Sequence, residues 1–173
     1  NTFGGRVTPT EKQILMAAED RFSVIIALPS YLMHWLRLAV KMRAEGRIGA
    51  IPTFRVAYCV GEPITEAYRK LLKTLFAELG SDDVTVVEGM SSTELRTGGF
   101  YECAEGSKLH LDPAGYFIEI LDADTLDPVP PGTPGMLVWS HIGWHGTAIL
   151  RYWTGDYVSG GVQWGDCPHC GHT

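Results

Sequence analysis

The stretch that decides the fold is residues 54–80, which read FRVAYCVGEPITEAYRKLLKTLFAELG. Its first seven residues are apolar except for Arg55 and predict a buried strand. A turn containing Pro63 follows, and apolar residues then recur at helical spacing up to Gly80, which predicts an amphipathic helix that starts at the proline and ends at the glycine. A strand followed by a covering helix is the repeating half of a βαβ unit.

The sequence on both sides of this stretch completes the pattern. Two short runs rich in Val and Ile, residues 23–28 and 84–87, predict further buried strands, and residues 31–43 have the apolar spacing of a helix. Residues 9–20 are a weaker helix candidate. Strand, helix, strand, helix and strand at this spacing predict a parallel sheet covered by helices. Ligands bind such sheets beyond the carboxyl ends of the strands.

After residue 99 the helical periodicity disappears. Segments with strand character alternate with Pro/Gly turns, and we expect strands at residues 116–121, 135–142 and 147–153. The predicted fold class is therefore α/β. Residues 1–99 form a subdomain with a parallel sheet and covering helices, and residues 100–173 form a small antiparallel β-barrel-like subdomain.

Composition excludes several classes of protein. The 173 residues include 14 Lys and Arg against 20 Asp and Glu, a net charge of −6, with no basic run of the kind that binds a nucleic-acid backbone. No apolar stretch approaches the roughly 20 residues that span a bilayer. Four cysteines are too few for a disulfide scaffold of this length. We expect a cytoplasmic protein without nucleic-acid or membrane partners.

Two short polar motifs have the residue types of a nucleotide site. Ser91-Ser92-Thr93-Glu94 follows a predicted strand, and its hydroxyls can donate hydrogen bonds to a phosphate while the carboxylate holds Mg²⁺. In Thr154-Gly155-Asp156 the carboxylate can accept hydrogen bonds from a ribose diol. From the residues alone, a capping turn at the first motif and a β-turn at the second are the favoured interpretations, because such turns are common.

The order of the motifs along the chain carries more information than any one of them. The chain contains, in order, Gly61-Glu62-Pro63, then residues 88–94 (EGMSSTE), 135–138 (GMLV) and 151–156 (RYWTGD). This series resembles the adenylate-forming, acyl-CoA synthetase-like enzymes. Within them the chain is most similar to the phenylacetate–coenzyme A ligase group, with which it also shares Glu102-Cys103, Leu109-His110 and the ending CPHCGHT at residues 167–173. The resemblance covers roughly residues 23–173.

The resemblance implies an ATP/AMP site with an assigned role for each matching residue. The adenine pocket is assigned to Gly61, Glu62, Glu88 and Met90, the α-phosphate to Thr93, Mg²⁺ to Glu94 and the ribose hydroxyls to Asp156. Thr93 and Glu94 are the implied catalytic residues. The implied reaction converts a carboxylic acid, expected to be aromatic, into an acyl-adenylate and then a coenzyme A thioester. A homodimer is left open.

The resemblance also implies a central segment of a longer enzyme. The phosphate loop and the catalytic lysine of the family have no counterpart in the sequence, so we expect this segment to be inactive by itself. Two alternatives remain. One is a non-catalytic relative that binds an aryl or nucleotide ligand, as a binding or resistance protein. The other is a zinc-stapled interaction module without nucleotide function.

The cysteines predict a structural zinc site. Cys167 and Cys170 have the spacing of two thiolates that share one metal ion, and Cys103 and His110 are the candidates for the other half of a Cys₃His site. A disulfide and unligated thiols are the competing interpretations, and His169 and His172 are alternative ligands. Cys59 lies in an apolar strand and is expected in the core.

Overall fold

The structure is a computed structural model that describes residues 7–95, 99–111 and 113–172. Its chain divides into two compact units. The first comprises the described residues of Asn1–Ser91 and Tyr101–Leu109, and the second those of Ser92–Phe100 and His110–Thr173. The α/β fold class, with one parallel and one antiparallel sheet, is confirmed.

A four-stranded sheet with the order β1-β2-β3-β4 organises the first unit. The three longer strands, β1 (Val24–Ala27), β2 (Val56–Val60) and β3 (Thr85–Met90), are parallel, and β4 (Phe100–Tyr101) has only two residues. The helices are α1 (Thr10–Asp20), α2 (Pro29–Ala44) and α3 (Glu66–Glu78). The predicted strand–helix alternation is therefore confirmed, including the weak candidate at residues 9–20.

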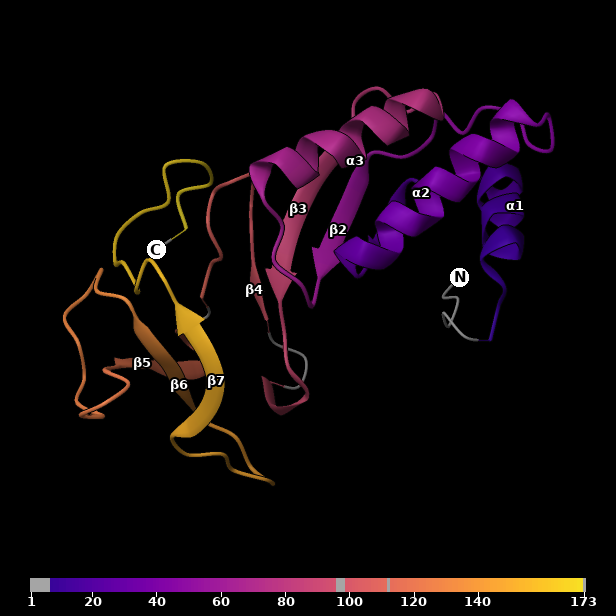
Figure 1. The fold of residues 1–173 in the computed structure, drawn as a ribbon. Helices are drawn as coiled ribbons and strands as arrows, with labels where there is room; N and C mark the ends of the chain where they lie inside the picture. The colour runs from indigo at the N-terminus through magenta and orange to yellow at the C-terminus, as the bar shows by residue number, and fades with distance from the viewer. Residues whose placement is uncertain (1–6, 96–98, 112, 173) are drawn as a thin grey trace. The chain divides into compact units, whose positions relative to one another are not determined.

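The core of this unit lies between the sheet and the helices. α2 and α3 cover one face of the parallel strands, as Figure 1 shows, and alternate residues of β2 that face them, Ala57 and Cys59, are fully buried. Phe54 links the two helices through edge-on ring contacts, 5.9 Å from Trp35 and 5.4 Å from Phe76 between ring centroids. Buried apolar area of this kind is the main stabilising contribution to such a fold.

The start of α3 differs from the prediction. Pro63 precedes the helix, and Thr65 caps it by accepting a hydrogen bond from the Tyr68 amide at 3.2 Å. The threonine side chain satisfies an amide that has no partner within the helix, and this fixes the start of the helix after Thr65 rather than at the proline. The expectation that Pro63 lies in the first turn is therefore wrong.

The second unit contains the short 3₁₀ helix η1 (Thr93–Leu95) and an antiparallel sheet with the order β5-β6-β7. Its strands are β5 (Tyr116–Leu121), β6 (Gly135–His141) and β7 (Tyr152–Val158). The strand predicted at residues 147–153 is wrong in its bounds, because β7 begins only at Tyr152. The residue before it, Arg151, has a φ of 48°, which an extended strand does not accommodate.

Among the described residues, the longest apolar helices fall short of what a membrane span requires.

Candidate nucleotide and metal sites

The carboxyl ends of β2 and β3 bring two of the predicted adenine residues to the same edge of the sheet. Val60, the last residue of β2, pairs with Gly89 of β3. Gly61, which follows β2, therefore lies beside Met90, the last residue of β3. Gly61 has a φ of 82°, and a Cβ at this position would lie 2.7 Å from Cδ2 of Leu28. The positive φ favours glycine here, whereas a Cβ could be accommodated by a shift of the flexible end of the Leu28 side chain.

Glu62 has a structural partner that the sequence did not reveal. Its carboxylate accepts hydrogen bonds from the Ser30 hydroxyl at 2.7 Å and from the Ser30 amide at 2.9 Å. These two bonds, the hydroxyl first, hold the pKa of Glu62 below its ordinary value. Because Ser30 lies in the first turn of α2, an anionic side chain also interacts favourably with the helix N-terminus. Glu62 thus connects the loop after β2 to α2.

Glu88 lies on β3, on the side of the sheet that faces the helices. Burial raises the pKa of its carboxyl above the ordinary value. Its backbone amide donates a hydrogen bond of 2.7 Å to Oε2 of Glu102, which follows β4. Met90, the last residue of β3, is half-buried. The first unit therefore contains the four predicted adenine residues on two adjacent strand ends.

Thr93 and Glu94 lie on η1 in the second unit. Oε1 of Glu94 accepts a hydrogen bond of 2.9 Å from the Tyr152 hydroxyl, and its carbonyl oxygen accepts one of the same length from Nε2 of His141. The pKa of Glu94 is lowered, first by a hydrogen bond from its own backbone amide and then by Tyr152 and Ser92. Glu94 is therefore an anion at neutral pH, which is the state that a divalent cation requires.

Asp156 lies inside β7, in an irregular part of the strand. Met136 pairs with Tyr157 but Val138 pairs with Trp153, so β7 has extra residues at this point and bulges. Gly155 has a φ of 84° in this bulge, and Asp156 is exposed. The β-turn considered for this motif is therefore wrong: the motif is a bulge within the strand. The same strand carries Tyr152, which binds Glu94.

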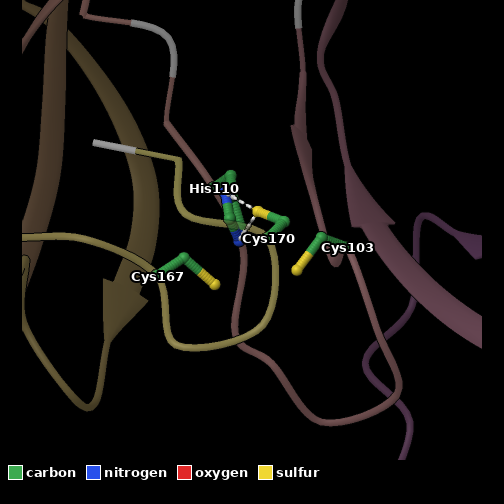
Figure 2. Close-up of side chains that lie close together, drawn as sticks. All are labelled: Cys103, His110, Cys167 and Cys170. Carbon is green, nitrogen blue, oxygen red and sulfur yellow. Dashed lines mark hydrogen bonds between the residues drawn. The ribbon is translucent and has the colours of Figure 1, made fainter.

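Three of the four predicted zinc ligands come together in the second unit. The ligand atoms of His110, Cys167 and Cys170 all lie within 4.8 Å of one another, and Sγ of Cys170 is 4.0 Å from each ring nitrogen of His110 (Figure 2). The turn of the Cys-x-x-Cys segment is closed by the Gly171 amide, which donates to the Cys167 carbonyl at 2.8 Å. The His169 amide approaches Sγ of Cys167 at 3.4 Å.

The chemistry of these ligands fits zinc. Zn–S bonds of about 2.3 Å and Zn–N bonds of about 2.0–2.1 Å place tetrahedral ligand atoms roughly 3.5–3.8 Å apart, slightly closer than the distances observed here. Nε2 of His172, an alternative ligand, is hydrogen-bonded to the Leu111 carbonyl at 3.1 Å. Cys103, the fourth predicted ligand and also labelled in Figure 2, follows β4 and belongs to the first unit.

Cys59 is a core residue, as predicted. It is fully buried between the sheet and the helices. Burial raises the pKa of its thiol to about 11, so it remains a neutral thiol at physiological pH.

The fold contains a buried ion pair that the sequence patterns above do not predict. Nη1 and Nη2 of Arg69 donate to the carboxylate of Glu102, both at 3.2 Å, and both side chains are only 5% exposed. A signal for it is present in the sequence. Arg69 precedes Leu72 by three residues and Phe76 by seven, which places it on the buried side of the helix, where a cation requires a partner.

The chain matches curated protein sequences and solved structures. No protein-family model matches the chain. The chain is 32% identical over 148 residues to the phenylacetate-coenzyme A ligase of Thermus thermophilus, and 28% identical over 148 residues to that of Aromatoleum evansii. Each match covers 85% of this chain and 32% of the relative, so the chain spans about a third of the length of these curated relatives.

Solved structures share the fold at lower sequence identity. A crystal structure of 2-hydroxyisobutyryl-CoA ligase in complex with 2-HIB-AMP and CoA matches with a TM-score of 0.70 and 15% identity, over 92% of this chain and 33% of that chain. A long-chain-fatty-acid-CoA ligase from Archaeoglobus fulgidus matches with a TM-score of 0.56 and 12% identity, over 76% of this chain and 27% of that one.

Proposed function

Because the chain is homologous to phenylacetate-coenzyme A ligases, we propose that it is part of an ATP-dependent acid–CoA ligase acting on an aromatic carboxylic acid. The observation that carries this proposal is the 32% identity over 148 residues to one such ligase. The shared fold and the anionic Glu94 support it.

In the proposed reaction, a carboxylate oxygen of the acid attacks the α-phosphorus of ATP, and the bond to pyrophosphate breaks. The thiolate of coenzyme A then attacks the acyl carbon and displaces AMP. The Thr93 hydroxyl would donate to the α-phosphate and Asp156 would accept from the ribose hydroxyls. Mg²⁺, when held by Glu94, neutralises phosphate charge. The residues around the adenine would be Gly61, Glu62, Glu88 and Met90. The protein's contribution is positioning and charge stabilisation.

Glu94→Gln is the decisive variant for this proposal. It keeps the size of the side chain and an acceptor for Tyr152 but removes the negative charge. We expect acid-dependent exchange of labelled pyrophosphate into ATP to fall about a hundredfold in the full-length protein that contains this chain. Glu19→Gln, an exposed substitution on α1, is the matched control and should leave the exchange unchanged.

Two results would contradict the ligase proposal. One is an absence of exchange with every member of a panel of aryl and alkyl acids, although the protein is folded. The other is an exchange rate in Glu94→Gln equal to that of the unsubstituted protein. If an aryl acid or ATP binds without any exchange, the alternative of a non-catalytic binding or resistance protein is supported instead.

We also propose a structural zinc ion bound by Cys103, His110, Cys167 and Cys170. Four protein ligands leave no open position, which is typical of a structural rather than a catalytic zinc site. Cys103 precedes His110 by only seven residues in the chain, and the two can therefore reach one ion.

Metal analysis tests the zinc proposal directly. After purification without chelators we expect about one zinc per chain, because a complete Cys₃His set binds zinc tightly at neutral pH. Cys167→Ser should lower the zinc content below half an equivalent, whereas Cys59→Ala, which alters a buried thiol of the core, should retain it. Less than half an equivalent in the unsubstituted protein would contradict this ligand set.

The remaining assignments form part of the same proposal. On the change in sequence pattern, we propose a subdomain boundary between residues 99 and 100, which differs from the division into two compact units by exchanging the segments around β4. The partners are a small-molecule carboxylic acid, ATP and coenzyme A, and the compartment is the cytoplasm.

A further inference from the structure

The loop that carries Cys103 is attached to β3 by two carboxylates. Oε2 of Glu102 accepts a hydrogen bond from the Glu88 amide at 2.7 Å, and Oε1 of Glu105 accepts one from the Val86 amide at 2.6 Å. Amides two residues apart point to the same edge of a strand. The two side chains therefore occupy positions that the carbonyl groups of a neighbouring strand would otherwise fill, beyond the two residues of β4.

Two cations of α3 hold these carboxylates. Besides the ion pair of Arg69 with Glu102, Nζ of Lys73 lies 3.0 and 3.1 Å from the two carboxylate oxygens of Glu105. The cations are four residues apart, one helical turn, and the carboxylates are three residues apart, so the two pairs lie side by side. Lys73 is 41% exposed and Glu105 28%, which makes this the more accessible of the two pairs.

Hydrogen bonds within the loop fix the backbone of Cys103 itself. The Ser107 hydroxyl oxygen accepts from the Cys103 amide at 3.1 Å and from the Ala104 amide at 3.3 Å. The Gly106 amide donates to Oε1 of Glu102 at 2.9 Å. The cysteine thus lies between two anchored glutamates, in a loop that hydrogen bonds from residues of the first unit help to order.

We propose that Glu102 and Glu105, held by Arg69 and Lys73, are positioning residues for the Cys103 thiolate. This inference rests on the zinc centre proposed above. A ligand whose backbone is already ordered loses little conformational freedom when it binds the metal, so the bound state is favoured. Without this anchoring the loop has to be ordered by the metal itself, and affinity decreases. Groups that orient a metal ligand are commonly worth 10–100-fold in affinity.

The test measures zinc affinity by competition with a chromophoric chelator, on the full chain. Glu105→Gln and Lys73→Met should each weaken binding about tenfold. Lys73→Arg should recover most of the loss, because it restores the ion pair. Lys70→Met is the matched control, since Lys70 is an exposed residue of the same helix that lies 4.0 Å from Glu66. Cys103→Ser gives the reference for complete loss of this ligand.

A cobalt-substituted protein provides a second measurement that does not depend on stability. The thiolate-to-cobalt charge-transfer band should weaken in Glu105→Gln toward the intensity in Cys103→Ser, and Lys70→Met should match the unsubstituted protein. If Cys103→Ser leaves zinc affinity unchanged, the ligand set of the proposed zinc centre is wrong. If Cys103→Ser weakens binding but Glu105→Gln and Lys73→Met behave like Lys70→Met, the positioning role is wrong and the zinc centre stands.

Discussion

Replacing Arg69 with methionine is expected to lower the free energy of unfolding by about 3–5 kcal/mol. The guanidinium is buried with the Glu102 carboxylate, and its removal leaves that carboxylate charged and uncompensated beneath α3. It also removes a donor to the Val86 carbonyl. The loss is large because breaking a buried ion pair from one side retains the cost of desolvating the other.

Urea unfolding followed by far-ultraviolet circular dichroism measures this effect. Lys70→Met, which removes an exposed cation from the same helix, should change the free energy by less than about 0.5 kcal/mol. The double variant Arg69→Met/Glu102→Gln should be less destabilised than Arg69→Met, because the glutamine keeps a hydrogen-bond acceptor but not the charge. A loss below about 1 kcal/mol for Arg69→Met would show that the pair is not buried in solution.

The single substitution Trp139→Ala is expected to lower the free energy of unfolding by about 3–5 kcal/mol. Trp139 is fully buried on β6, and its ring lies 5.2 Å from that of Tyr152 and 5.8 Å from that of Tyr116 between centroids. Removing it leaves a cavity under the residue that binds Glu94. We therefore also expect weaker pyrophosphate exchange in the full-length protein.

Trp164→Ala is the control for this variant. Trp164 is 66% exposed, and its truncation should change the unfolding free energy by no more than about 0.5 kcal/mol. The same urea titration measures both. Equal effects of the two substitutions would contradict the assignment of Trp139 to the core of the second unit.

Much of the fold could be predicted because its signals are local. The strand expected at residues 116–121 has the bounds of β5, and the helix expected at residues 31–43 lies within α2. Buried strands and amphipathic helices are recognisable from the spacing of apolar side chains within a window of a few residues. β4 has no such pattern, because a strand of two residues exists only through its pairing in the sheet.

The errors have identifiable physical causes. The strand predicted at residues 147–153 begins before β7, because residues 147–150 have apolar and branched side chains, whereas the positive φ of Arg151 delays the start of β7. A turn is one sequence-based interpretation of Gly155, but its positive φ belongs to a bulge within the strand. Backbone conformations of this kind depend on the neighbouring strand, which a local pattern does not contain.

For the candidate sites, the sequence indicates which residues are involved but not the residues to which they are hydrogen-bonded. Glu62 binds Ser30 across 32 residues, and Glu94 binds Tyr152 across 58. Contacts between such distant positions follow from the packed fold and have no periodic signature. The Cys-x-x-Cys spacing is the exception, because both thiols lie on one short turn and their proximity is local.

The two carboxylates that cover the outer edge of β3 also bear on how the protein avoids self-association. A sheet edge with unsatisfied amides is a template onto which a strand from another molecule can add. Here the amides of Val86 and Glu88 are already bonded to Glu105 and Glu102. A foreign strand would have to displace two anions held by cations before it could pair. The ionic network thus protects this edge against aggregation without the need for a longer strand.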